Sequence, residues 1–233
     1  MERAYRNVSY LFVLILAFVF LGFFKTYFGL FPRFHGLPTA AHFHALGFLL
    51  WIAMLIVQPL LIRYNQLPLH RALGKFSYFL VPYIVLATFG MMRQAYHLKG
   101  QSWLIAALPP GLYFAATGLL NFVLFYILAM VYKRNTPYHM RYIIATSLAL
   151  IQPSLGRLFN DELRLGPLGA ILTTLTVYAV LIGLIVYDKS KFGKVYPPYW
   201  VTLAFTLMLN ISVPFVPPTH LWQSIALRIG RFL

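Results

Sequence analysis

The sequence predicts an all-α, polytopic integral membrane protein with seven transmembrane helices and a short amphipathic helix at the C-terminus. Three observations lead to this fold class. Of the 233 residues, 61% are hydrophobic and only 10% are charged, whereas about a quarter of the residues in soluble domains are charged. The apolar residues gather in seven long runs, and the segments between these runs are too short to hold a soluble domain.

Each run approaches the roughly 20 apolar residues that a helix needs to cross about 30 Å of hydrocarbon. Because an open chain cannot satisfy its backbone polar groups in lipid, each run is expected to be helical. The first run is not followed by a small-residue cleavage site, which indicates a retained anchor rather than a signal peptide. The runs lie approximately at residues 8–27, 39–62, 76–96, 103–132, 142–158, 167–187 and 198–216.

The tail that follows Pro217 and Pro218 has a different pattern. At helical periodicity its apolar residues share one face and its polar residues another. This pattern predicts an interfacial amphipathic helix lying on lipid, with docking onto a partner as the alternative. We therefore divide the chain into a transmembrane domain at residues 1–218 and an interfacial tail at residues 219–233. The apolar face comprises Trp222, Ile225, Ile229 and Leu233, and the polar face comprises His220, Ser224, Arg228 and Arg231.

Basic residues predict the orientation of the bundle, because the cytoplasmic ends of transmembrane helices carry an excess of Lys and Arg. With the N-terminus in the cytoplasm, eleven of the 19 basic residues fall on the cytoplasmic side. We therefore predict a cytoplasmic N-terminus and a C-terminus outside, and we call the two ends of the bundle inner and outer. The inner set comprises Arg3, Arg6, Arg63, Arg71, Lys75, Lys133, Arg134, Arg141, Lys189, Lys191 and Lys194, and the outer set Lys25, Arg33, Arg93, Lys99, Arg157, Arg164, Arg228 and Arg231.

Composition also excludes several function classes. The net charge of +15 is explained by topology and by attraction to anionic lipids rather than by nucleic-acid binding, since no basic and aromatic face stands apart from the apolar runs. The absence of cysteine excludes disulfides, thiolate metal sites and iron–sulfur clusters. No Asp, Glu or Lys lies near the middle of a run, which argues against a carboxylate-driven pump and a retinal Schiff base.

Seven histidines carry most of the chemistry that this composition permits, since imidazole binds iron, copper or zinc without help from thiolates. His42 and His44 open the second run near its outer end and, at 100° per residue, point to nearly opposite sides of the helix. His44 is the better ligand because its stripe is expected to face the bundle interior, while His42 supports it or faces a neighbouring helix. The stripe comprises His44, Gly47, Trp51, Leu55 and Gln58.

His97 lies at the outer end of the third run, which is antiparallel to the second. It could therefore meet His44 across a short gap, with Met91 or Met92 as a softer substitute ligand. The predicted metal ligands at the outer end are thus His42, His44 and His97.

His70 and His139 can form a second pair at the inner end, since they precede the third and fifth runs. Two histidine pairs at opposite faces would suit two axially ligated b-type haems and electron transfer across the bilayer. The alternative is that these two histidines form hydrogen bonds with helix ends or bind lipid phosphate, as interfacial basic residues often do.

Arg157, at the outer end of the fifth run, is a candidate for cofactor binding. A guanidinium near the outer histidines could pair with a haem propionate, a quinone oxygen or an anionic lipid. Its spacing of four residues from Asp161 also allows a structural ion pair on one helical face.

Short motifs between roughly residues 40 and 158 resemble those of a widespread family of bacterial multi-pass membrane proteins, which implies location in the bacterial cytoplasmic (inner) membrane. More remotely, an outer His followed by an inner Leu-His resembles the two-haem b-type cytochromes that reduce ferric iron with ascorbate. The His-x-Arg helix start resembles small assembly factors of haem–copper oxidases. The motifs are Phe43-His44 with Trp51 and Gln58, Leu69-His70-Arg71 with Leu73-Gly74, and His139-x-Arg141.

Two main functions are therefore expected. The first is a redox or electron-transfer membrane protein with a histidine-lined site for b-type haem, iron or copper near the outer face, with His44, His97, His70, His139 and Arg157 as the candidate cofactor-binding residues. The second is a non-catalytic accessory or assembly subunit of a larger membrane complex. Transport or sensing of a small solute or lipid-like ligand is a third reading, which lacks a charged transport path.

Overall fold

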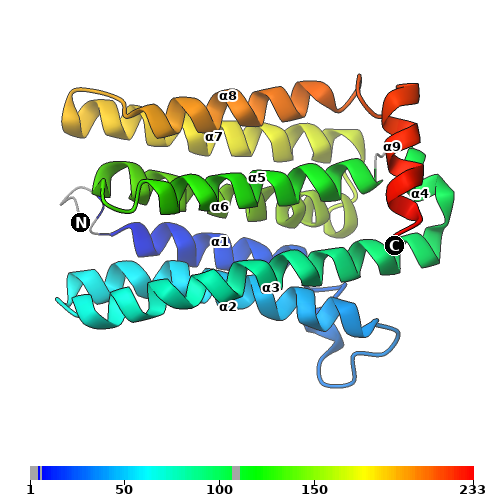
Figure 1. Ribbon diagram of the computed structural model, residues 1–233, viewed down its shortest axis with the longest axis horizontal. Helices are drawn as coiled ribbons and strands as arrows, with labels where there is room; N and C mark the ends of the chain where they lie inside the picture. Colours follow the sequence, from blue (N-terminus) through cyan, green and yellow to red (C-terminus); the bar gives the residue numbers. More distant parts are fainter. Residues whose placement is uncertain (1–4, 6, 107–110) are drawn as a thin grey trace.

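The computed structural model describes residue 5 and residues 7–106 and 111–233, and the regular elements in these ranges are all helical (Figure 1). This confirms the all-α prediction. A 3-10 turn at Phe28–Leu30 and a π-helical turn at Leu158–Glu162 accompany the α-helices. The α-helices are α1 (Val8–Gly22), α2 (Thr39–Arg63), α3 (Leu67–Lys99), α4 (Gln101–Ile105), α5 (Gly111–Val131), α6 (Thr136–Arg157), α7 (Pro167–Phe192), α8 (Pro197–Ser212) and α9 (His220–Gly230).

Within the described residues, four helices, not seven, are long and apolar enough to cross a membrane, namely α2, α3, α5 and α7. The prediction of seven such spans is corrected for two physical reasons. α1 has 15 residues and α8 has 16, and at about 1.5 Å per residue both fall short of a hydrocarbon core of roughly 30 Å. α6 has 22 residues, but polar side chains such as Arg141 and Thr146 make it less apolar.

α6 lies at the centre of the bundle, where it packs against α1, α5, α7 and α8 (Figure 1). Its polar side chains therefore face protein rather than lipid, and the hydroxyls of Thr146 and Ser147 donate hydrogen bonds to carbonyls one turn back, each at 2.7 Å. The contact between α1 and α6 is close: a Cβ added at Gly22 would lie 2.0 Å from the carbonyl oxygen of Ser154. Small residues thus let these two backbones approach, as in other membrane bundles.

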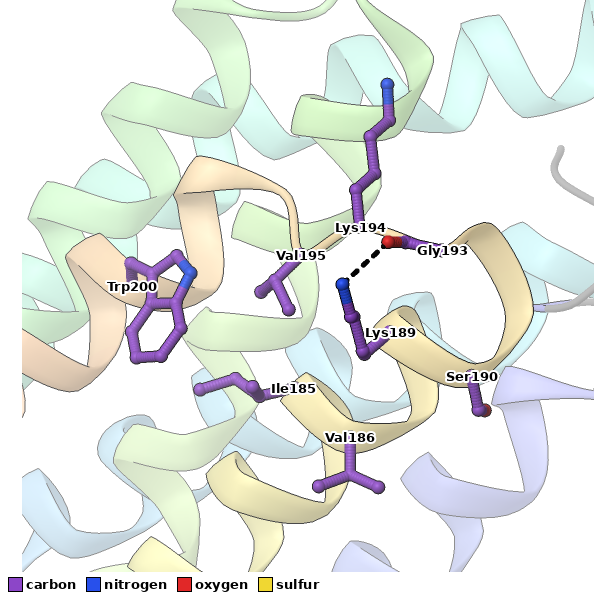
Figure 2. A pocket seen from close by; sticks show the side chains of 8 residues that line it. All are labelled: Ile185, Val186, Lys189, Ser190, Gly193, Lys194, Val195 and Trp200. Carbon is purple, nitrogen blue, oxygen red and sulfur yellow. Dashed lines mark hydrogen bonds between the residues drawn. The ribbon is translucent and has the colours of Figure 1, made fainter.

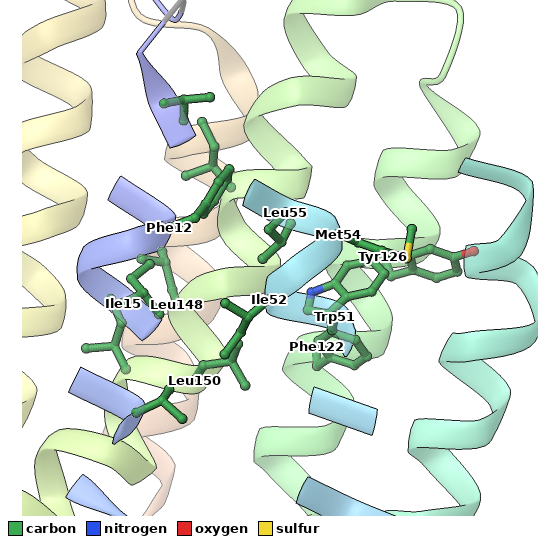
Figure 3. Close-up of a cluster of buried hydrophobic side chains, with 14 of the residues drawn as sticks. Phe12, Ile15, Trp51, Ile52, Met54, Leu55, Phe122, Tyr126, Leu148 and Leu150 are labelled. Carbon is green, nitrogen blue, oxygen red and sulfur yellow. The ribbon is translucent and has the colours of Figure 1, made fainter. Parts of the chain in front are cut away.

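The interior stripe predicted on α2 is confirmed. Its central residue, Trp51, is fully buried and meets Phe122 and Tyr126 of α5 edge to face, with ring centroids 5.2 and 5.7 Å apart (Figure 3). These aromatic contacts join α2 to α5 in the middle of the bundle. Along the stripe Gly47, Trp51 and Leu55 are buried, and His44 and Gln58 are half-buried.

The long helices run side by side, so the connections gather at two ends (Figure 1). The start of α1 and the α2–α3, α5–α6 and α7–α8 links lie at the end that we call inner. The α1–α2 link, α4 and α9 lie at the outer end. Two of the basic residues behind the orientation prediction, Arg3 and Arg6, lie outside the described residues. Which end faces the cytoplasm stays a prediction.

The C-terminal tail forms α9, which lies across the outer end of the bundle beside α4 (Figure 1). The Thr219 hydroxyl caps it by accepting a hydrogen bond from the backbone N–H of Trp222 at 3.2 Å. Ala226 and Gly230 are buried, and a Cβ at Gly230 would lie 2.5 Å from the side chain of Leu104. One face of α9 is therefore covered by protein, and contact of the rest with lipid stays a prediction.

Candidate functional site

The outer histidines have separate partners. The Nδ1 atom of His42 lies 3.1 Å from the hydroxyl of Tyr27 in the α1–α2 link, and its ring packs edge to face on Phe34 at 5.0 Å. Burial raises the pKa of Tyr27, so this phenol stays protonated at neutral pH. His42 is thus oriented by the α1–α2 link, away from the stripe that carries His44.

His44 points into the bundle, as the stripe predicted. Its Nδ1 atom lies 3.3 Å from the hydroxyl of Thr88 on α3. That hydroxyl donates its proton to the carbonyl of Ile84 at 2.7 Å, so it accepts from His44. Nδ1 of His44 therefore carries the hydrogen, and the neutral ring keeps its lone pair on Nε2.

His97 does not join His44. It is exposed, and its Nε2 atom accepts a hydrogen bond from the Nε–H of Arg93 at 3.4 Å. Nine residues separate His97 from Thr88, the partner of His44, which is about 13 Å along a helix, whereas two nitrogens on one metal lie roughly 4 Å apart. Across the described residues, no group of three or more His, Asp or Glu gathers where a metal could bind.

Arg157 lies within electrostatic range of His44. Its guanidinium sits 4.4 Å from the ring centroid of Phe23 and donates to the carbonyl of Pro153 at 3.3 Å. Asp161 also lies within electrostatic range of Arg157. The carboxylate next to it, Glu162, forms an ion pair with Lys25 at 2.8 Å. Arg157 is therefore held by α6 and α1 near the outer histidine, and its predicted role in cofactor binding stays a prediction.

The inner histidines lie at the same end of the bundle. His70 is in the first turn of α3 and His139 in the first turn of α6, and His139 lies within electrostatic range of His70. The Nδ1–H of His139 donates to the carbonyl of Ala129 in the last turns of α5 at 2.7 Å. A carbonyl only accepts, so the lone pair of neutral His139 must be on Nε2. The sequence also allowed His139 to form a hydrogen bond with a helix end. Its Nδ1 atom does so, at the end of α5, while Nε2 remains available.

His70 is only partly satisfied. Its Nδ1 atom is buried and has no hydrogen-bond partner among the described residues. Its backbone carbonyl accepts a hydrogen bond from Nε2 of Gln58 at 3.2 Å, while Oε1 of the same Gln58 is also buried without a partner. Two unpaired polar atoms therefore lie where the end of α2 meets the start of α3, and buried polar atoms without partners are uncommon in proteins.

Sequence reasoning missed a second polar cluster at the inner end. Arg141 of α6 and Asp188 of α7 are both fully buried, and Nε and NH2 of Arg141 each donate to a different oxygen of Asp188 at 2.7 Å. The third guanidinium nitrogen donates to the carbonyl of Pro137 at 2.9 Å. In the sequence, Arg141 indicated topology and belonged to the His139-x-Arg141 motif, but 47 residues separate it from Asp188. The one signal for a pair was a carboxylate at the very end of an apolar run.

Aromatic residues enclose this ion pair. The hydroxyl of Tyr5 donates to Asp188 at 2.7 Å and lies 2.9 Å from the hydroxyl of Tyr199. The guanidinium lies 3.8 Å from the ring centroid of Tyr196. Burial, with smaller contributions from Tyr199 and Asp188, raises the pKa of Tyr5 far above its ordinary value. The cluster ties the chain before α1 to α6, α7 and α8 and is closed to ligands.

Comparison of the chain with family models, with curated proteins and with solved structures gives no match.

Proposed function

We propose that this protein is a multi-pass membrane redox protein that holds a transition metal, either as an ion or as the iron of a b-type haem, between His70 and His139. The observation that carries the proposal is the unsatisfied inner pair: two imidazoles from different helices lie within electrostatic range, and one has a buried nitrogen without a partner. Imidazoles without thiolates suit iron, copper or zinc, and iron or copper would supply one-electron exchange.

The inner end is preferred to the outer end because each outer histidine has a hydrogen-bond partner at one ring nitrogen, whereas Nδ1 of His70 is buried without a partner among the described residues. The outer contacts join His42 to Tyr27, His44 to Thr88 and His97 to Arg93. At the inner end the Ala129 carbonyl also fixes the ring of His139 so that Nε2 keeps its lone pair. A hydrogen bond of this kind to the far nitrogen is typical of metal-ligating histidines.

Arg71 would distinguish a haem from a bare metal ion. It follows His70 directly in the chain and lies within electrostatic range of it. A guanidinium in that place can pair with a haem propionate, whereas a cationic metal ion gains nothing from it. If the group is a haem, Arg71→Gln weakens its retention; if it is a metal ion, the same change has no adverse effect.

The bundle is proposed to lie with its long axis across a bacterial cytoplasmic membrane, N-terminus inside and C-terminus outside. α1 begins at the inner end and the chain finishes at the outer end (Figure 1), which supports termini on opposite sides. A C-terminal alkaline phosphatase fusion should be active, and an inactive fusion beside an active cytoplasmic reporter would reject this orientation.

The function is tested by the absorption spectrum and metal content of the protein purified in detergent. We expect a transition metal at near one per chain, with a Soret band if it is haem. His70→Ala and His139→Ala should each lose it. The matched control is His220→Ala, because His220 is exposed on α9 at the outer end, and it should keep the metal.

Retention of the metal in both inner variants would reject the inner site. Its loss from His44→Ala alone would restore the outer site. Absence of any metal and any Soret band from wild-type protein, together with stable co-purification of other subunits, would replace the redox function with that of an accessory subunit.

A further inference from the structure

A surface groove of about 700 Å³ opens at the inner end, between the last turns of α7 and the start of α8 (Figure 2). Its wall is apolar, with Ile185 and Val186 from α7 and Val195 from the link to α8. Trp200 of α8 closes one side and is 53% exposed. The groove is independent of the histidine site proposed above.

The rim of the groove is cationic. Lys189 and Lys194 both line it and are exposed. Nζ of Lys189 donates to the carbonyl of Gly193 at 2.9 Å (Figure 2), which holds the ammonium over the end of α7. Lys194 lies over the ring of Tyr196, with Nζ 4.9 Å from its centroid. The neighbouring carboxylate, Asp188, turns inward to Arg141, so it does not neutralise this rim.

The position of the groove determines the kind of ligand. α7 is long and apolar enough to cross a membrane, so its charged end lies at the level of the lipid headgroups, where an exposed Trp is also favoured. A ligand that fits must place an anionic group on the two lysines and an apolar chain along Ile185 and Val186. An anionic phospholipid has both parts in this order.

We propose that this groove binds one anionic phospholipid, with the phosphate on Lys189 and Lys194 and an acyl chain against Ile185, Val186 and Trp200. The hydroxyl of Ser190 donates to the carbonyl of Tyr187 at 2.9 Å. Its oxygen is left to accept from a hydroxyl of the headgroup, which phosphatidylglycerol supplies and phosphatidylcholine lacks.

The test is native mass spectrometry of the full chain in detergent, titrated with phosphatidylglycerol or phosphatidylcholine. We expect one retained phosphatidylglycerol and no comparable phosphatidylcholine. In Lys189→Gln/Lys194→Gln, retention of phosphatidylglycerol should weaken about tenfold or more, since each lysine near an anionic lipid contributes several-fold. The matched control is Lys191→Gln, which removes a charge from the last turn of α7 outside the groove and should bind almost as wild type.

Three results would overturn the proposal. The first is unchanged retention in Lys189→Gln/Lys194→Gln, and the second is an equal loss in Lys191→Gln. The third is displacement of the lipid by free glycerol phosphate at similar concentration, which would show a site for a soluble phosphate compound. The three lysines are exposed, so the variants should have the same unfolding temperature as wild type. Equal temperatures exclude misfolding as the cause of weaker lipid retention.

Discussion

The inner end of the bundle holds two buried polar clusters that differ in one respect. In the first, the three guanidinium nitrogens of Arg141 donate hydrogen bonds and both oxygens of Asp188 accept them. In the second, His70 and Gln58 each keep a buried polar atom with no partner among the described residues. Burying a charge or a polar atom costs free energy unless its hydrogen bonds are replaced. The complete bonding of the first cluster fits a structural role, and the missing partners of the second support our proposal that it binds a metal.

The same difference separates the inner histidines from the outer ones. Nδ1 of His44, at the outer end, has the hydroxyl of Thr88 as its partner at 3.3 Å. His70 is not satisfied in this way. In a membrane bundle we therefore give more weight to a buried polar atom that lacks a hydrogen-bond partner than to a residue type that could bind a ligand.

The largest expected effect comes from breaking the complete cluster. Asp188→Asn removes the carboxylate that accepts two hydrogen bonds from the buried Arg141, and removing one partner of a buried ion pair typically costs about 3–5 kcal/mol. Unfolding in detergent, followed by circular dichroism, measures this change in the free energy of unfolding. Asp161→Asn is the control, because Asp161 is exposed and its carboxylate is not enclosed. A loss below about 1 kcal/mol for Asp188→Asn would contradict a structural role.

Replacing both partners sharpens the same point. Arg141→Met with Asp188→Leu replaces both members of the buried ion pair with apolar side chains, so the double variant should be more stable than Asp188→Asn alone. If the double variant is instead as unstable as the single one, packing rather than the broken ion pair explains the loss.

A smaller effect is expected from Tyr5→Phe. The change removes a hydrogen bond to a carboxylate, which is worth about 1.5–3 kcal/mol, while the ring contacts remain. The free energy of unfolding should fall by that amount, measured as above. Tyr10→Phe is the control, because Tyr10 is 68% exposed. Equal effects of the two changes would show that the Tyr5 hydroxyl does not belong to the cluster.

The buried hydroxyl of Tyr5 should also make the free energy of unfolding depend on pH in the alkaline range. Burial raises the pKa of this phenol above its ordinary value of 10.0, so above that pH the unfolded chain releases a proton that the folded protein keeps. The stability contribution is complete below about pH 10 and is lost as pH rises, by up to roughly 1.4 kcal/mol per pH unit. The difference between wild type and Tyr5→Phe should therefore shrink above pH 10; a constant difference would contradict it.

The smallest effect belongs to the incomplete cluster. Gln58→Leu removes one hydrogen bond to the His70 carbonyl and also one unsatisfied buried oxygen. These two consequences oppose each other, so stability without metal should change by less than about 1 kcal/mol. The measurement is the free energy of unfolding of metal-free protein. A loss as large as that of Asp188→Asn would erase the distinction between the two clusters.

Much of this architecture follows from periodicity and composition. The spacing of the stripe on α2 places Trp51 and Leu55 in the core, and it separates His42 from His44. Each of the seven apolar runs contains helix within the residues that the structure describes, but hydropathy alone does not show where a helix ends. The first run continues past Gly22, where α1 stops, and the fourth is divided between α4 and α5.

The pairing of distant polar residues could not be predicted, because periodicity does not encode which helices are neighbours. Arg141 meets Asp188 across 47 residues, and Thr88 reaches His44 across 44. The expected pair of His44 and His97 failed to form since a helix rises about 1.5 Å per residue and His97 lies beyond the partner of His44. His70 and His139 begin helices at the same end of the bundle, as their places in the sequence indicated, and their pairing on one metal stays a prediction.

The most direct test of the central claim is the metal-to-protein ratio of His70→Ala, measured beside wild type and His44→Ala in one preparation. The account predicts a ratio near one for wild type and for His44→Ala, and near zero for His70→Ala. A wild-type ratio near zero, or equal ratios in the two variants, would contradict a metal site at the incomplete inner cluster.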